Sequence, residues 1–135
     1  MTILIDTDME GLTGVVLEPQ VNQEGKDFSF GQKMLANDVN AAIDGAVRAG
    51  ADQVFVSDGH GGGGNMVLTE MDPRARYLLG KIPSETLSDI YSGLDLVFCI
   101  GYHAMAGTGQ VFPAGLSRPD NRGQHLCPAG VQERL

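Results

Sequence analysis

The chain is poor in basic side chains and in cysteine, and both shortages narrow the classes to which it can belong. It has 9 Lys and Arg against 17 Asp and Glu, for a formal net charge of −8. Nucleic acids and anionic membranes bind surfaces with clustered basic residues, so neither is an expected partner. Cys99 and Cys127 have neither C-x-x-C spacing nor the density of a disulfide scaffold. We therefore expect a cytoplasmic protein whose charged partner is a cation.

Long apolar runs and tryptophan are absent too. The longest apolar stretch, near "LDLVFCIG", has the length of a strand and falls far short of the roughly 20 residues that span a bilayer. The N-terminal "MTILIDTDMEG" has no basic segment and reaches acidic residues early, unlike a secretory signal. Without Trp, the core must come from Val, Ile, Leu, Met and Ala, and 135 residues at 42% hydrophobic content suffice for one such domain.

Short apolar runs alternate with helical patterns along the chain. Four runs predict β-strands, at residues 2–6, 53–58, 75–80 and 94–101. Apolar residues at helical spacing predict a long helix over residues 30–49, and Gly50 is a typical helix stop. The segment "PSETLSDIYSG" predicts a short helix with Ser84 as its N-cap, and a brief helical turn is expected over residues 66–71.

Apolar strands separated by helices are typical of an α/β protein. We predict a mostly parallel sheet with helices on both faces, formed by residues 1–108. In such sheets, ligands bind outside the carboxyl ends of the strands. Residues 109–135 carry three of the six prolines and no periodic pattern, so we expect them to form an irregular tail.

Acidic and imidazole side chains follow three of the four predicted strands. Asp8 and Glu10 come after the first strand, and residues two apart in extended backbone project to the same side. His60 follows the second strand and His103 the fourth. Taken singly, each has an ordinary explanation. Asp8 and Glu10 can be a solvated acidic strand end, His60 an exposed loop histidine, and His103 a histidine hydrogen-bonded to backbone beneath a loop. A parallel sheet, however, would bring the three segments together.

Converging carboxylates and imidazoles shift toward their neutral forms unless a cation compensates for the lost hydration. A mixed set of Asp, Glu and His ligands suits zinc, with manganese or iron as alternatives, whereas Ca²⁺ and Mg²⁺ prefer oxygen ligands alone. We therefore predict a zinc site at the carboxyl ends of the strands, formed by Asp8, Glu10, His60 and His103.

Three neighbouring side chains have roles that the sequence leaves open. Asp6 and Asp58 can orient an imidazole or nearby backbone, or they can simply form strand-end turns. Tyr102 can contact a substrate or pack against the edge of the sheet.

His60 lies in a glycine-rich loop, "SDGHGGGGN", for which two functions are conceivable. Gly59 and Gly61 permit positive φ and close approach, so the imidazole can turn back over the strand end. The alternative is a phosphate cradle. A Walker loop needs a Lys that "GHGGGGNM" lacks, and the early acidic residues would repel a pyrophosphate. We interpret the loop as a turn that orients the His60 side chain toward a metal ion.

Three blocks, "DTDMEGLTGV", "VSDGHGGGGNM" and "IGYHAMAGT", together resemble the zinc-dependent D-aminopeptidases of the DppA type. They occur in that family's order and at similar separations, over about residues 3–108. The resemblance implies a two-zinc site in which Asp8 bridges the metals, Glu10 and His60 bind one zinc, and His103 binds the other. It also implies that the zinc-bound water hydrolyses short peptides from an N-terminal D-amino acid such as D-Ala, within a ring-like homo-oligomer.

Beyond about residue 108 the chain departs from the family. Members have a further histidine, proposed to be catalytic, where this chain reads "QVFPAGLSRP", and a later glutamate that completes the second zinc site. Glu133 in "GVQERL" lacks the flanking glycines, so we do not assign it that role, and His125 matches no family position. Family chains also continue into a second half. We therefore expect an incomplete second zinc site and a truncation or shifted reading frame. The sequence leaves open whether this chain is active or inactive, and it assigns no catalytic residue.

The predicted function is that of a metal-dependent hydrolase, a metalloprotease of the aminopeptidase type that acts on short D-amino-acid peptides and is homo-oligomeric in its full-length form. The alternative is a small non-catalytic α/β domain that binds a phosphorylated ligand through the glycine loop. A third interpretation is a fragment that folds poorly because its sheet has an unpaired edge. Metal content separates the first two.

Overall fold

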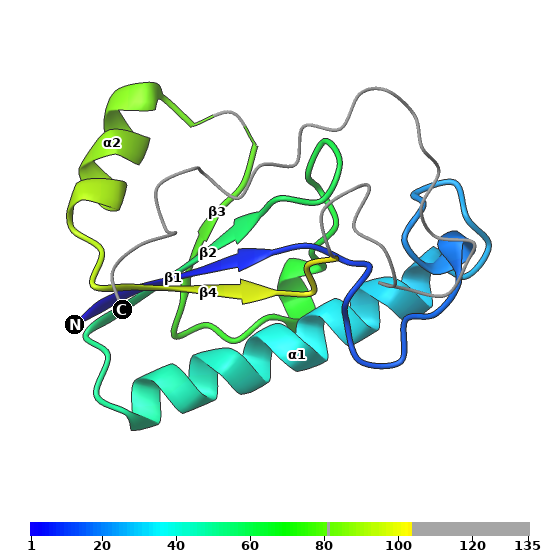
Figure 1. The fold of residues 1–135 in the computed structure, drawn as a ribbon, viewed down its shortest axis with the longest axis horizontal. Coiled ribbons are helices and arrows are strands. Elements are labelled where there is room, and N and C mark those ends of the chain that lie inside the picture. The colour runs from blue at the N-terminus through cyan, green and yellow to red at the C-terminus, as the bar shows by residue number, and fades with distance from the viewer. Residues whose placement is uncertain (81, 104–135) are drawn as a thin grey trace.

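The computed structural model describes residues 1–80 and 82–103 (Figure 1). The elements follow in the order β1 (Thr2–Thr7), the 3-10 helix η1 (Glu18–Gln20), α1 (Phe28–Arg48), β2 (Gln53–Asp58), the 3-10 helix η2 (Leu68–Glu70), β3 (Arg76–Leu78), α2 (Ser84–Ser92) and β4 (Leu96–Ile100). Every strand and helix predicted within this part is present, with ends within two residues of the prediction. The domain limit at residue 108 and the predicted tail over residues 109–135 lie outside the described residues.

The four strands form one parallel sheet in the order β3-β2-β1-β4. β1 is flanked on both sides and is buried on both faces, since Ile3, Leu4 and Ile5 are each exposed by 2% or less. β2 and β4 lie on opposite sides of β1, so the strand order reverses there, which is where α/β sheets bind ligands. The predicted α/β class with a mostly parallel sheet is confirmed.

α1 covers one face of the sheet and supplies most of the helical part of the core (Figure 1). Its apolar positions at helical spacing face the strands, and the buried ones are Leu35, Ala36, Val39, Ile43 and Ala46. They pack in one cluster with Ile3 and Ile5 of β1 and Val54 and Val56 of β2. Burying each Leu, Ile or Val side chain stabilises the fold by about 1.5–3 kcal/mol. Gly50 follows the helix at φ 90°, as a helix stop requires.

α2 lies on the side of the sheet opposite α1 in Figure 1 and has no fully buried residue. The predicted N-cap at Ser84 is wrong: Ser84 is the first helical residue and Pro83 is the N-cap, without a capping side-chain hydrogen bond. The reason is that the Pro83 carbonyl already accepts the first helical hydrogen bond, from Leu87 N at 3.1 Å. Within the described residues, neither α-helix is both long enough and apolar enough to cross a membrane.

The loop between β1 and α1 folds back onto the first turn of α1. A Cβ atom at Gly31 would lie 1.8 Å from the Gln20 carbonyl oxygen, so the loop can approach the helix this closely only because residue 31 is glycine. The Gln20 side chain accepts hydrogen bonds from the backbone N–H groups of Val16 and Leu17, both at 2.8 Å. This packing holds the backbone of Val21 close to the carboxyl end of the sheet.

Candidate metal centre

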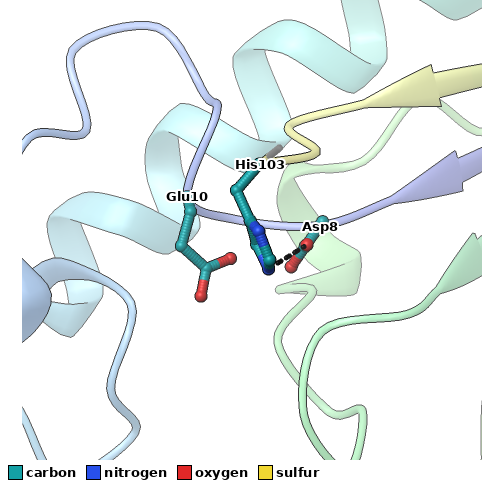
Figure 2. Close-up of side chains that lie close together, drawn as sticks. All are labelled: Asp8, Glu10 and His103. Atoms are coloured by element: carbon teal, nitrogen blue, oxygen red, sulfur yellow. Dashed lines mark ion pairs between the residues drawn. The ribbon is translucent and has the colours of Figure 1, made fainter. Parts of the chain in front are cut away.

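The structure brings all four predicted ligand residues together at the carboxyl ends of β1, β2 and β4. Asp8 and Glu10 follow β1, His60 follows β2 and His103 follows β4. Figure 2 shows Asp8, Glu10 and His103 turned toward one another, and one ligand atom from each lies within 4.8 Å of the other two. His60 joins this group because its Nδ1 atom lies 2.8 Å from Asp8 Oδ1 and 3.2 Å from Glu10 Oε2.

Asp8 is the centre of the cluster, and its side chain is only 7% exposed. Its Oδ1 atom faces His60 and also accepts a hydrogen bond from the backbone N–H of Met9, at 2.9 Å. Its Oδ2 atom lies 3.8 Å from His103 Nε2. The two oxygens of one carboxylate are therefore turned toward two different imidazoles.

The hydrogen bonds of His60 show which ring nitrogen faces the carboxylates. Nε2 lies 2.8 Å from the backbone carbonyl oxygen of Val21, and because a carbonyl only accepts, Nε2 must carry the hydrogen. In a neutral ring, Nδ1 would then present a lone pair to the carboxylates of Asp8 and Glu10. That arrangement is repulsive unless a proton or a metal ion lies between them.

Electrostatics around His60 and Glu10 favour a cation at this point. Burial lowers the pKa of His60, but the Asp8 and Glu10 carboxylates outweigh burial and raise this pKa to about 10. Burial raises the pKa of Glu10, and the neighbouring His60 ring reverses this and lowers it to about 2. The buried Oε2 atom of Glu10 still accepts no hydrogen bond from any residue in the described part of the chain. The metal-free site thus holds a proton and an unsatisfied oxygen where a metal would bind.

His103 lies near Asp8 because the backbone after β4 crosses closely over the backbone after β1. The N–H of Asp8 donates to the Ile100 carbonyl at 2.8 Å, and the N–H of Gly11 donates to the Gly101 carbonyl at 2.7 Å. Gly101 has φ 74°, and a Cβ atom there would lie 2.0 Å from the Asp8 carbonyl oxygen. Glycine is therefore required at residue 101 if the chain is to turn from β4 across the end of β1.

The glycine-rich loop turns back toward β1, as the sequence predicts. Gly61, Gly63 and Gly64 have positive φ, and a Cβ atom at Gly59 would lie 2.9 Å from the Thr7 carbonyl oxygen. The loop also uses its own N–H groups internally: Gly59 N–H donates to the Thr7 carbonyl and Gly63 N–H to the His60 carbonyl, at 2.9 and 3.0 Å. These donors are not available to an anion.

Asn65 holds the loop closed, and sequence reasoning missed this role. It is fully buried, and its Nδ2 atom donates to the His60 carbonyl at 2.7 Å and to Asp58 Oδ1 at 2.8 Å. Its Oδ1 atom accepts from Gln23 Nε2 at 3.1 Å. Asp58, proposed from sequence as an orienting group, also accepts the backbone N–H of Asn65 at 2.7 Å, so it orients backbone. An Asn after glycines is common in turns, and nothing in the sequence distinguishes this one.

The donor set and its surroundings fit a zinc ion. Zinc accepts mixed carboxylate and imidazole ligands, and a cation would satisfy the unbonded Glu10 oxygen and the Nδ1 atom of His60. The fold and the site together define a parallel α/β protein that gathers two carboxylates and two imidazoles at its strand-order reversal.

Comparison with known proteins places the chain in a family of this class. The model of the Peptidase_M55 family, described as D-aminopeptidase, matches residues 1–114, and the chain belongs to this family. A D-aminopeptidase of Bacillus subtilis (strain 168) is 27% identical to it over 112 residues. That match covers 80% of this chain and 40% of the relative.

A solved structure agrees with the assignment. It is described as the Zn-dependent D-aminopeptidase DppA from Bacillus subtilis, a self-compartmentalizing protease, and it matches with a TM-score of 0.69 at 26% identity. The match covers 80% of this chain and 40% of that structure. This chain therefore spans about two fifths of the length of the relatives that it resembles.

Proposed function

We propose that Asp8, Glu10, His60 and His103 bind zinc. The observation that carries this proposal is the arrangement at His60, where the Val21 carbonyl occupies Nε2 and leaves Nδ1 against two carboxylates. One nitrogen that faces two carboxylates needs a positive charge between them, and a metal ion bound by all three groups supplies it. The same Glu10 Oε2 atom, 3.2 Å from His60 Nδ1, accepts no hydrogen bond within the described residues, so it too is free to bind a cation.

We further propose two zinc positions that share Asp8. The first lies among Asp8, Glu10 and His60, and the second lies between Asp8 and His103. Support comes from Asp8 itself, because Oδ1 faces one imidazole at 2.8 Å and Oδ2 faces the other at 3.8 Å. When bound, zinc would polarise a substrate carbonyl and lower the pKa of a coordinated water. The protein residues keep the site partly closed to bulk water and hold the histidine nitrogens in their orientations.

The function that these features support best is that of a zinc-dependent aminopeptidase for short peptides with an N-terminal D-amino acid, D-Ala in particular. Membership of the D-aminopeptidase family supports the reaction class. A homo-oligomer is proposed because the similar solved structure is described as self-compartmentalizing. A cytoplasmic location is also proposed, and the peptidase assay decides whether this chain turns over substrate by itself.

Binding of a phosphorylated ligand through the glycine loop has less support. The N–H groups of Gly59, Gly63 and Asn65 are bonded inside the protein. The carboxylates of Asp8 and Glu10 next to His60 would also repel a phosphate.

Zinc titration of the metal-free chain tests the proposal. We expect zinc binding by the wild-type chain, a large loss of affinity in His60→Ala and in His103→Ala, and none in His125→Ala as the matched control. A wild-type chain that takes up no zinc would overturn the metal site. Release of D-Ala from D-Ala-D-Ala but not of L-Ala from L-Ala-L-Ala, abolished by a chelator, tests the peptidase assignment separately; zinc uptake without turnover would restrict the proposal to metal binding.

A further inference from the structure

We propose that Asp6 is a positioning residue that joins the three segments carrying the candidate zinc ligands, and that it fixes His103 through the hydroxyl of Tyr102. This inference rests on the proposed zinc site. Asp6 is not itself among the proposed ligands.

The Asp6 carboxylate accepts one hydrogen bond from each neighbouring segment. Its Oδ1 atom accepts from the Ser57 hydroxyl at the end of β2, and its Oδ2 atom accepts from the Tyr102 hydroxyl at 2.5 Å, just beyond β4. Asp6 lies beside Ser57 in the strand register, so the first of these bonds joins adjacent strands directly. One side chain of β1 thus connects the ends of β1, β2 and β4.

Each of these contacts lies close in sequence to a candidate ligand. Asp6 comes two residues before Asp8, Ser57 three residues before His60, and Tyr102 immediately before His103. A hydrogen bond restrains the backbone most strongly at the residue that makes it and at its immediate neighbours. Bonds this close in sequence to the candidate ligands therefore restrict where the ligand atoms can lie. Partners that hydrogen-bond a metal ligand directly contribute about 10- to 100-fold to metal affinity, and because Asp6 acts one residue further away we expect the lower end of that range.

His103 depends on this anchor more than His60 does. The His60 side chain is 15% exposed, whereas the His103 side chain is 35% exposed and therefore has less protein packed around it. The chain has already left β4, and the backbone bond between Gly11 and Gly101 ends two residues before His103. The Tyr102 hydroxyl adds a side-chain anchor within one residue of the ligand.

The absence of a side chain at Gly59 leaves room for the hydrogen bond between Tyr102 and Asp6. A Cβ atom at Gly59 would lie 3.2 Å from the Tyr102 hydroxyl and 3.6 Å from Asp6 Oδ1. A larger residue at 59 would therefore press on the bond between Tyr102 and Asp6. This gives Gly59 a role that differs from the positive-φ role of the later glycines in the loop.

The test compares Tyr102→Phe with a matched control, Tyr77→Phe. Both changes remove one hydroxyl that donates a hydrogen bond, but the Tyr77 hydroxyl donates to the Asp72 carbonyl at 2.7 Å, away from the site. We expect Tyr102→Phe to weaken zinc binding about 10-fold and Tyr77→Phe to leave it unchanged. Thermal unfolding in chelator reports the loss of stability of each variant separately.

A double-mutant cycle distinguishes positioning from a general structural role. If Tyr102 acts through His103, Tyr102→Phe should weaken zinc binding in the wild-type background and have no further effect in the His103→Ala background. Equal effects in both backgrounds would overturn the inference, as would a Tyr102→Phe chain that binds zinc like the wild type.

A second pair of variants keeps the test decisive if Tyr102→Phe does not fold. Ser57→Ala removes a second donor to Asp6, and Ser92→Ala removes a hydroxyl that donates to the Asp89 carbonyl in α2, at 3.0 Å. We expect weaker zinc binding in Ser57→Ala and not in Ser92→Ala, and equal binding in both would contradict the role of Asp6. A wild-type chain without zinc would instead refute the proposed function, so the two failures are distinguishable.

Discussion

Replacing Glu10 by glutamine removes one negative charge from the cluster and keeps the size of the side chain. At ~4 Å and an effective dielectric constant of ~20, two unit charges interact by about 4 kcal/mol, so a divalent ion gains about 8 kcal/mol from Glu10. Desolvation of the ion and the carboxylate offsets much of this gain, and losing one partner of a buried pair costs about 3–5 kcal/mol. Because the Glu10 side chain is 18% exposed, we expect the lower end of that range. Zinc affinity should therefore fall roughly a hundredfold.

Competition with a chromophoric chelator at fixed pH and ionic strength measures this change. Glu70→Gln is the matched control, because Glu70 is exposed and the substitution alters the net charge equally. Unfolding of both variants in excess chelator shows whether Glu10→Gln weakens the fold itself. A Glu10→Gln chain that is folded and binds zinc as tightly as the wild type would refute the reasoning.

Three further predictions concern the metal-free chain and the fold around the site. The raised pKa of His60, about 10 against an ordinary 6.5, means that His60 stabilises the metal-free fold below pH 6.5 and that this contribution is lost as the pH rises through 10. Urea unfolding in chelator should show that decline, and His60→Gln should reduce it. Gly101→Ala, with its Cβ 2.0 Å from the Asp8 carbonyl oxygen, should lower both the Tm and zinc affinity, whereas Gly93→Ala, with no atom nearer than 3.7 Å, should not lower zinc affinity. Leu35→Ala should reduce the free energy of unfolding by about 3 kcal/mol without changing zinc affinity once the chain is folded.

The strands and the long helix could be predicted because burial leaves a pattern in the sequence. β1 is buried on both faces and therefore reads as a continuous apolar run, and α1 shows its core face at helical spacing. The convergence of Asp8, Glu10, His60 and His103 could be predicted for a related reason. Each follows a parallel strand of one sheet, and the carboxyl ends of such strands meet at one edge.

The surroundings of the four residues could not be predicted in the same way. The partner of His60 Nε2 is the backbone carbonyl of Val21, and because every residue has a carbonyl, its use leaves no mark in the sequence. Gly31 admits the loop that carries Val21, but an isolated glycine in a helix does not show what approaches it. Ser84 failed as an N-cap because the first hydrogen bond of α2 begins one residue earlier than its side-chain chemistry suggests.

X-ray absorption at the zinc edge of the zinc-loaded chain tests the central claim most directly. The account predicts a first shell of nitrogen and oxygen atoms at about 2.0–2.2 Å, with imidazole scattering that is reduced in His60→Ala. Sulfur ligands at about 2.3 Å, or a first shell unchanged by His60→Ala, would contradict it.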